Sequence, residues 1–198
     1  MTLVSKNLKK FKSELKTILD KSRFEHTLGV SYTAVCLAMK YECNLQQAEV
    51  AGLLHDCAKC VPDDKKLKQC EKYNISITDT EIDNPSLLHA KLGAFYAMHK
   101  YNVTDREVIN AILVHTTGAP DMTLLEKIIF VADYIEPNRK TAPNLAAIRK
   151  MAFEDIDMAV YMIMDDTLNY LNSKSGQIDT MTNKAYDYYK KLIESRQN

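Results

Sequence analysis

The sequence contains few residues that interrupt helices. Only five glycines and five prolines occur in 198 residues, and apolar residues recur at intervals of three and four along most of the chain. No convincing strand pattern is present. These absences favour helices throughout nearly the whole sequence, so we expect an all-α fold.

Cysteine and long apolar runs are also scarce. The five cysteines are an odd number without the spacing of a disulfide framework, which is typical of a protein in a reducing compartment. Residues 1–22 combine lysines with an amphipathic pattern and contain no apolar run of signal-peptide or membrane-spanning length. We therefore expect a soluble, cytoplasmic protein that does not associate with membranes.

The chain carries no excess of either charge. Its 26 basic residues balance 26 acidic ones, so no net field attracts a polyanion, and a large nucleic-acid interface is disfavoured. A small, highly charged ligand is compatible with this composition. The length suits one domain, for which we predict a helical bundle over 1–198, with a core at about 23–190 and an N-terminal amphipathic helix in 1–22. A homodimer is left open.

Apolar spacing and capping signals define the predicted helices. They cover about 8–19, 23–42, 44–59, 62–73, 86–101, 104–115, 123 to beyond 133, 144–151, 155–171 and 182–194. Three of them begin with a residue pair that resembles a capping box, namely Asn44 with Gln47, Thr104 with Glu107, and Thr123 with Glu126. The polar residues 74–85 are predicted to form a loop, which in a compact domain is commonly functional or mobile.

Histidine and aspartate recur at inward-facing helical positions. The pair His55-Asp56 ends an apolar stretch in which Ala48, Ala51 and Gly52 share a face with His55, and such small residues let another helix approach closely. His26, His115 and Asp133 lie on the apolar stripes of other helices, whereas His89 is placed on the flank of its own. A buried carboxylate such as Asp133 needs a cation, a metal or strong donors. The pattern predicts a metal site with nitrogen and oxygen ligands.

Other candidate motifs have simpler explanations. A single histidine is more often a hydrogen-bonded structural residue than a ligand, and His99, beside Lys100, is predicted to lie on the surface. Cys57 and Cys60 form a C-x-x-C pair without the second pair of a zinc ribbon or the βαβ context of a redox site, so we regard it as coincidental. The methionines after residue 155 are typical of core packing.

The series His26, His55-Asp56 and Asp133 resembles the H…HD…D pattern of HD-domain metal-dependent phosphohydrolases. Four longer stretches are similar to the bacterial YqeK branch of that superfamily: His55-Asp56-Cys57-Ala58-Lys59, His89-Ala90-Lys91-Leu92-Gly93-Ala94, His115-Thr116-Thr117-Gly118, and Val131-Ala132-Asp133-Tyr134-Ile135-Glu136-Pro137-Asn138-Arg139. The similarity extends from about Arg23 to Tyr188, and the D-Y-I-E-P-x-R stretch is its most specific part. It implies symmetrical hydrolysis of diadenosine tetraphosphate to two ADP by a metal-bound hydroxide.

The resemblance also implies a role for each candidate residue. The metal ligands would be His26, His55, Asp56 and Asp133, with His89 and His115 completing a second metal site or touching the phosphates. Catalysis would rest on Asp56, His55 and Lys59, and the substrate would be held by His26, His89, His115, Thr116, Asp133 and Arg139. Iron is the metal that the family favours, while manganese and zinc suit the same ligands.

Several alternatives stay open at this point. Residues 140–143 and 178–180 differ from the pattern expected of close relatives, which leaves the segments that close over the substrate undefined. Lys59 is equally well explained as a basic residue near a helix C-terminus. Another nucleotide phosphohydrolase, such as a nucleotidase or triphosphohydrolase, would use the same fold. A non-catalytic nucleotide-binding regulatory module is a third hypothesis, against which the complete ligand set argues.

Overall fold

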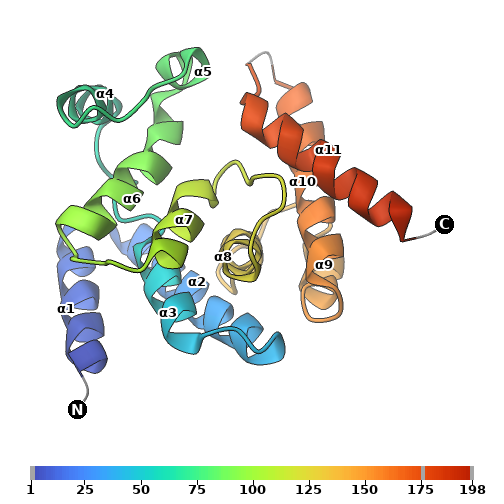
Figure 1. Ribbon diagram of the computed structural model, residues 1–198, viewed down its shortest axis with the longest axis horizontal. Helices are drawn as coiled ribbons and strands as arrows, with labels where there is room; N and C mark the ends of the chain where they lie inside the picture. The colour runs from blue at the N-terminus through green and yellow to red at the C-terminus, as the bar shows by residue number, and fades with distance from the viewer. Residues whose placement is uncertain (1–2, 175–176, 197–198) are drawn as a thin grey trace.

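The computed structural model describes residues 3–174 and 177–196, and over these residues the chain forms helices and no strand (Figure 1). The prediction of an all-α fold is confirmed. Residues 1–2, 175–176 and 197–198 of the predicted domain lie outside the described residues. The elements are α1 (Leu3–Ile18), α2 (Lys21–Lys40), α3 (Leu45–Leu54), α4 (Asp63–Lys72), α5 (Asp79–Asp83), the 3-10 helix η1 (Pro85–Leu87), α6 (Leu88–His99), α7 (Arg106–Val114), α8 (Leu124–Ile135), α9 (Leu145–Met151), α10 (Ile156–Asn172) and α11 (Thr180–Ser195).

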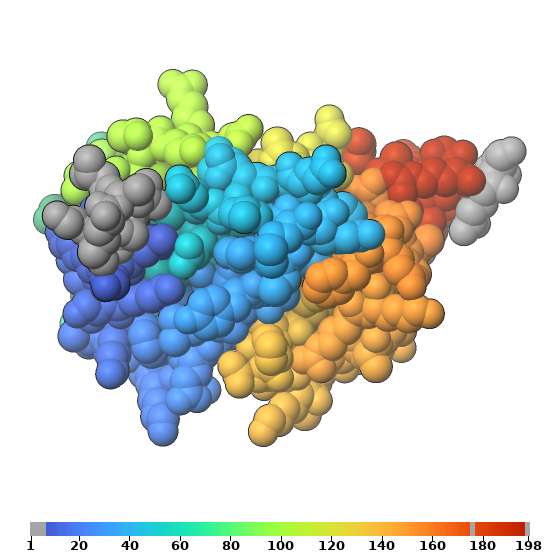
Figure 2. Space-filling model, turned by 90° about the horizontal axis from the view of Figure 1, so that it is seen from below, coloured from blue at the N-terminus to red at the C-terminus, as the bar shows by residue number. Residues whose placement is uncertain are grey.

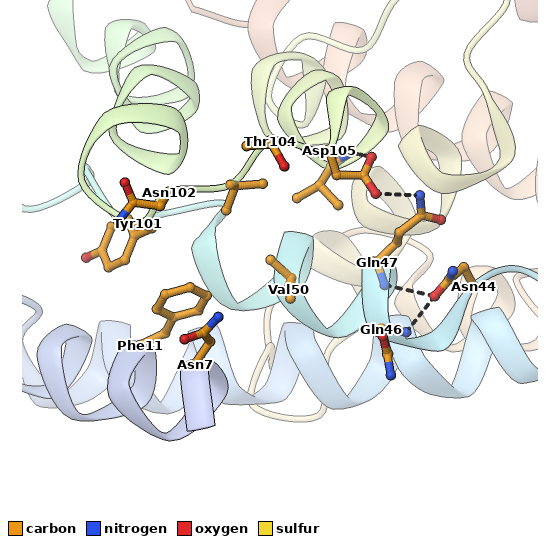
Figure 3. A pocket seen from close by; sticks show the side chains of 12 residues that line it. Asn7, Phe11, Asn44, Gln46, Gln47, Val50, Tyr101, Asn102, Thr104 and Asp105 are labelled. Atoms are coloured by element: carbon orange, nitrogen blue, oxygen red, sulfur yellow. Dashed lines mark hydrogen bonds between the residues drawn. The ribbon is translucent and has the colours of Figure 1, made fainter. Parts of the chain in front are cut away.

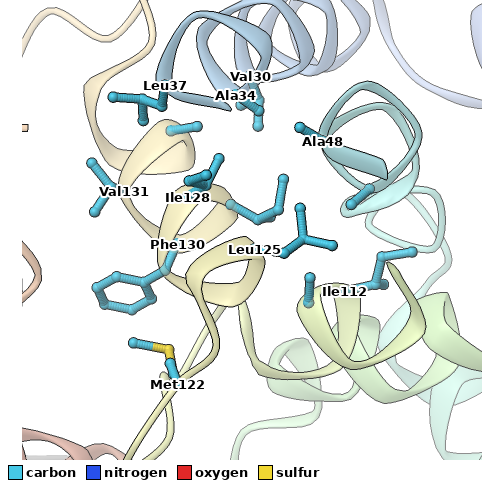
Figure 4. Packing of buried hydrophobic residues seen from close by; sticks show 14 of the residues in the cluster. Val30, Ala34, Leu37, Ala48, Ile112, Met122, Leu125, Ile128, Phe130 and Val131 are labelled. Carbon is cyan, nitrogen blue, oxygen red and sulfur yellow. The ribbon is translucent and has the colours of Figure 1, made fainter. Parts of the chain in front are cut away.

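Helix α8 lies at the centre of the fold. It contacts α2, α3, α7 and α10, and Figure 4 shows its side chains between those of α2, α3 and α7. Leu125, Ile128, Ile129 and Ala132 are all buried, because the helix is apolar on nearly every face, as a helix enclosed by others must be. Asp133, in the last turn of α8, is therefore carried from the core toward its edge.

Helices α2 and α3 approach each other very closely, as the small residues of α3 predict. A Cβ atom built on Gly52 would lie only 2.8 Å from the Cα atom of Ser31 on α2. A backbone atom cannot move aside as a flexible side chain can, so only glycine fits here. This approach brings the end of α3, where His55 lies, against the middle of α2.

The helix starts confirm one of the three predicted capping boxes. Thr123 and Glu126 exchange both bonds at the start of α8. Asn44 caps α3, but the side chain of Gln47 bonds to Asp105 (Figure 3) and also to Glu107. The box at Thr104 and Glu107 is wrong, because the carboxylate of Asp105 accepts from the first backbone amides of α7.

A pocket of about 240 Å³ lies beside these caps, between α1, α3 and the α6–α7 connection (Figure 3). Amide side chains and the rings of Phe11 and Tyr101 line it. None of the histidines or aspartates that the sequence proposes as site residues is among its lining residues. The pocket is therefore separate from the site described below.

The predicted loop over 74–85 contains a helix. Thr78 and Glu81 form a capping box that opens α5, and η1 follows directly at Pro85. Glu81 is buried and its carboxylate accepts a hydrogen bond from Lys91 of α6 at 2.7 Å. This long-range ion pair holds a segment whose polar composition indicated a loop.

Helix α11 begins two residues earlier than the sequence predicts. Asp179 caps it by accepting from the backbone amide of Met181. Helices α10 and α11 pack against each other and α10 against α8 (Figure 1). Residues of both helices line a pocket together with Asp133, so the pair borders the end of α8 that carries this aspartate. Among the described residues, no helix has the length and apolar character needed to cross a membrane.

Candidate metal centre

Six residues that the sequence proposes as site residues meet at one point of the structure. They come from different elements: His26 from α2, His55 and Asp56 from the end of α3, His89 from the first turn of α6, His115 from the end of α7, and Asp133 from α8. Their ligand atoms form three overlapping triads, in each of which the atoms lie within 4.8 Å of one another. His89 is buried among them, so its predicted place on the flank of α6 is wrong.

Asp56 lies between two pairs of histidines. Its Oδ2 atom is 3.8 Å from Nε2 of His26 and 3.5 Å from Nε2 of His55. Its Oδ1 atom is 3.2 Å from Nε2 of His89 and 3.6 Å from Nε2 of His115. Each carboxylate oxygen thus faces its own imidazole pair, which is the arrangement of a carboxylate that bridges two adjacent cation positions.

Asp133 joins the first of these two positions. Its Oδ1 atom lies 3.1 Å from Nε2 of His26. Its side chain is about a quarter exposed, which differs from the full burial that the sequence predicts. The reason is that the last turn of α8 emerges from the core at the edge of a pocket.

The protonation of three histidines follows from their hydrogen bonds. Nδ1 of His55, His89 and His115 lies 2.7, 2.6 and 2.7 Å from the backbone carbonyl three residues earlier, which belongs to Gly52, Ser86 and Ile112 respectively. A carbonyl only accepts, so in each ring Nδ1 carries the proton. The Nε2 lone pair then faces Asp56, which is the form in which imidazole binds a metal.

His26 reaches the same state by a different contact. Its Nδ1 atom lies 3.2 Å from Oε1 of Glu136, a carboxylate that is only 2% exposed. A neutral ring with Nδ1 donating to this carboxylate directs its Nε2 lone pair at Asp56 and Asp133. Carboxylates in this position orient a metal-binding histidine and raise its basicity.

Three of the ligand atoms fit a metal because they are buried hydrogen-bond acceptors that no donor of a described residue reaches. Nε2 of His26, Nε2 of His55 and Oδ1 of Asp56 are buried and have no hydrogen-bond partner among the described residues. Nε2 of His89 and Nε2 of His115 are 3.2 Å apart, and with both Nδ1 atoms protonated no proton lies between them. Buried acceptors converge in this way where a cation binds.

The close packing of these carboxylates and imidazoles shifts the pKa values of several of them. Burial would raise the pKa of Asp56, but the imidazoles around its carboxylate, His55 first among them, hold that pKa well below its usual range. Burial also lowers the pKa of His89 to about 4, so this ring is neutral at pH 7. The pKa of His26 is raised, because Asp133 and Glu136 outweigh the effect of burial.

Three cationic side chains surround the cluster, namely Arg23, Lys59 and Arg139. Arg23 donates through Nη1 to Oδ2 of Asp56 at 2.8 Å. Nζ of Lys59 lies 3.2 Å from Nε2 of His89 and 4.0 Å from Oδ1 of Asp56, and burial lowers its pKa. Lys59 lies beyond the end of α3 and extends toward the cluster, which favours a role at the site over one at the helix dipole.

Arg139 and Thr116 border the cluster on its open side. Arg139 donates through Nε and Nη2 to the carbonyl of Asp133, and through Nη2 to its carboxylate at 3.1 Å. Oγ1 of Thr116 lies 3.1 Å from Nε2 of both His89 and His115. A pocket of about 240 Å³ opens between them and contains His115, Thr116, Asp133, Tyr134, Arg139 and Met164 among its lining residues.

Sequence reasoning gave no role to Arg23, Glu136 or Arg149. Arg149 donates to the carbonyls of Ile135, Glu136 and Arg139 and so fixes the segment that follows α8. Arg23 and Glu136 each lie three residues from a proposed ligand, His26 and Asp133 respectively. That spacing places Arg23 on the same helical face as His26 and could have indicated it, whereas Glu136 is the residue that ends α8, with extended backbone.

The candidates that the sequence set aside lie elsewhere. His99 is exposed and stacks on Phe95. All five cysteines are free, and Cys57, whose pKa burial raises to about 12, is buried beside the carbonyl of Gly93. Neither Cys57 nor Cys60 belongs to a group of ligands among the described residues. Met164 is buried, as expected of core packing.

Three comparisons with known proteins indicate the same family. The family model described as HD domain matches residues 23–138. Proteins named symmetrical bis(5'-nucleosyl)-tetraphosphatase from Halalkalibacterium halodurans and Bacillus subtilis are 38% and 37% identical, over 87% and 88% of this chain and 91% and 92% of their own. A crystal structure from Clostridium acetobutylicum, titled a predicted HD superfamily hydrolase involved in NAD metabolism, superposes with a TM-score of 0.90 at 39% identity, covering 93% of this chain and 97% of that one.

Proposed function

The chain belongs to the HD domain family, and from this premise we propose that it is a metal-dependent phosphohydrolase that cleaves diadenosine tetraphosphate symmetrically into two ADP. Relatives that it matches along most of their length carry that activity in their names. The observation that supports the chemistry is the position of Asp56, each of whose oxygens faces its own pair of imidazoles. A complete set of this kind favours turnover over a binding-only role.

The proposed ligands fall into two groups. His26, His55, Asp56 and Asp133 would hold one divalent ion, and His89, His115 and the second oxygen of Asp56 would hold another. Divalent ions bound there would lower the pKa of a water from near 16 to about 7 and so provide hydroxide at neutral pH. Iron is the identity we propose, and metal analysis of the purified protein distinguishes it from manganese and zinc.

The protein's own groups would then bind and orient the polyphosphate. Lys59 lies beside His89 and Arg139 beside Asp133, and both would neutralise non-bridging oxygens, where charge-assisted hydrogen bonds are strong. Thr116 presents its hydroxyl to the same space. In the cleavage, an oxygen derived from water bonds to the second phosphorus of one ADP half while the bridging P–O bond breaks. The electron pair of that bond leaves with the other ADP.

Product analysis tests this function. Metal-loaded protein is incubated with diadenosine tetraphosphate, and an early time point is separated by chromatography. Symmetrical cleavage gives ADP as the sole nucleotide product, because the attacked phosphorus is the second one of the half held beside the metal. Equal amounts of AMP and ATP would refute this geometry even if the metal ligands were assigned correctly.

Two variants separate chemistry from general destabilisation. Asp56→Ala removes the carboxylate that both ligand groups share, so turnover should be abolished while the circular dichroism spectrum stays helical. His99→Ala changes an exposed histidine outside the cluster and should leave turnover within about twofold of wild type. Equal losses in the two variants would show that Asp56 has no special role.

A further inference from the structure

A second cavity opens onto the cluster from the side of His26. It has a volume of about 340 Å³ and lies between the first turn of α2 and residues 136–141 after α8. Figure 2 shows the face seen from below, with an indentation between the blue residues near the start of α2 and the yellow-orange segment that follows α8. The sequence indicated no function for this side of the cluster.

The cavity is predominantly cationic. Arg23, Arg139 and Lys140 line it, and Glu136 is the acidic residue among its lining. Glu136 is already engaged, because it accepts from the backbone amide of Asn138 at 2.7 Å and contacts Nδ1 of His26. Arg23 and Arg139 are each paired with one carboxylate, Asp56 and Asp133 respectively, so Lys140 is the cation at the cavity without an acidic partner among the described residues. An anionic ligand would supply that partner.

These cations retain unused donors. Arg23 binds Asp56 through Nη1, and its Nε and Nη2 atoms form no hydrogen bond with the described residues. Arg139 uses Nε and Nη2 on Asp133, so its Nη1 atom is unused among the described contacts. Lys140 is exposed and forms no ion pair with any described residue. Planar guanidinium groups with spare N–H donors match phosphate oxygens.

Arg139 separates this cavity from the pocket that contains Thr116. The Thr116 pocket includes aromatic and apolar side chains, among them Phe130 and Tyr134, which suit a nucleobase. The cationic cavity has polar and charged neighbours, which suit phosphates. Both border the cluster, from the His115 side and the His26 side respectively, so a linear ligand that spans them passes the cluster near its middle.

We propose that the cavity between Arg23, Arg139 and Lys140 binds the phosphates of the nucleoside diphosphate half that departs. This assignment rests on the proposed function, because only a substrate with two nucleotide halves needs a binding region on each side of the cluster. It gives Lys140, in the segment 140–143 whose role the sequence left undefined, a part in substrate binding. The two products then leave from two separate regions.

Lys140→Gln tests the assignment without altering a residue that contacts the proposed metal ligands. Loss of one charge-assisted hydrogen bond should lower kcat/KM for diadenosine tetraphosphate by roughly 10- to 100-fold. Lys21→Gln is the matched control, because Lys21 is also an exposed lysine. It lies on the first turn of α2, near the cavity, but does not line it. This variant should remain within about twofold of wild type.

Binding of ADP to the metal-loaded protein gives a second readout. Calorimetric titration of wild type should show two ADP sites per chain, and Lys140→Gln should weaken one of them about tenfold or more while the other is unchanged. Arg23→Lys keeps the charge but loses the planar donor pair, so it should weaken the same site. The metal content of each variant is measured, so that a loss of metal is recognised and not counted as support.

The outcomes distinguish this inference from the proposed function. If wild type releases ADP alone but binds one ADP, or if Lys140→Gln matches Lys21→Gln in both assays, the cavity does not hold the departing half. Inorganic phosphate that competes with neither ADP site would equally overturn it. If wild type gives products other than ADP, the proposed function itself has failed.

Discussion

Metal removal should destabilise the protein. It should also reverse the order of stability between wild type and the Asp56→Asn variant. In the metal-loaded state, wild type should unfold at a higher temperature than Asp56→Asn, because the carboxylate belongs to both ligand groups. In chelator, Asp56→Asn should be at least as stable as wild type. The asparagine Nδ2 group can donate protons to imidazole lone pairs that the aspartate leaves without donors.

The loss of stability on metal removal can be bounded from the buried acceptors and from the binding energy of the metal. Nε2 of His26, Nε2 of His55 and Oδ1 of Asp56 have no hydrogen-bond partner among the described residues. Each buried acceptor without a partner costs about 1–3 kcal/mol, so the three together cost about 3–9 kcal/mol when no cation satisfies them. Metal at a thousand times its Kd stabilises the native state by about 4 kcal/mol. For a chain of this size that corresponds to a fall in Tm of roughly 8–16 °C on chelation.

Thermal unfolding followed by circular dichroism measures all four states, namely wild type and Asp56→Asn, each with metal and with chelator. His99→Gln serves as the control and should follow wild type in both conditions, because His99 is exposed and remote from the cluster. The reasoning is refuted if a chelator that removes all metal leaves the Tm of wild type unchanged. It is also refuted if the chelator lowers both proteins by the same amount.

Three further predictions concern the surroundings of the cluster. Glu136→Gln should weaken metal binding about 10- to 100-fold, and Gly29→Ala should act in the same direction because a Cβ there would collide with the Glu136 carboxylate; both are measured by competition with a chromophoric chelator. In metal-free protein, stability should fall as the pH drops from about 6.5 to 4, since burial holds the pKa of His89 at about 4 and the unfolded chain binds the proton first. The loss should be at most about 3 kcal/mol, and urea titrations at several pH values should show a smaller one in His89→Gln. Gly52→Ala should cost roughly 1–3 kcal/mol in the same assay, because the added methyl meets the backbone of Ser31; an unchanged midpoint would show that α2 and α3 can separate.

The elements that the sequence predicted correctly are those with strong local signals. Apolar spacing located α8, and the pair Thr123 and Glu126 located its first residue, because both signals act within one or two helical turns. The small residues of α3 correctly indicated a close helix contact. The same periodicity placed His26 and His115 on inward faces, and the structure buries both.

The errors arise where a distant partner decides the local structure. Helix α5 is an exception, because the Thr78 and Glu81 capping box that opens it is a local signal that sequence reasoning missed. The ion pair between Glu81 and Lys91 then attaches this polar segment to α6. The side chain of Gln47 does not complete a capping box, because it reaches Asp105 and Glu107, which are 58 and 60 residues away. A single sequence contains no signal for such contacts. His89 was misplaced for a related reason, since its inward direction depends on how α6 is rotated against α7.

Each imidazole is oriented by the end of its own helix, whereas the convergence of the imidazoles depends on how several helices pack. His55 and His115 each follow the last residue of a helix, where the final backbone carbonyls have no partner within the helix. A histidine there can donate from Nδ1 to the carbonyl three residues back, as both do, and its Nε2 atom then points away from the helix. The helix that precedes an inward-facing histidine therefore fixes its tautomer, with the Nε2 lone pair free to bind a metal. Whether two such helices direct their rings at the two oxygens of one carboxylate is decided by the packing of α3 and α7 on α8 and of α6 on α7. For this reason the sequence suggested which residues are the ligands. That they fall into two groups, one at each oxygen of Asp56, emerged from the three-dimensional structure.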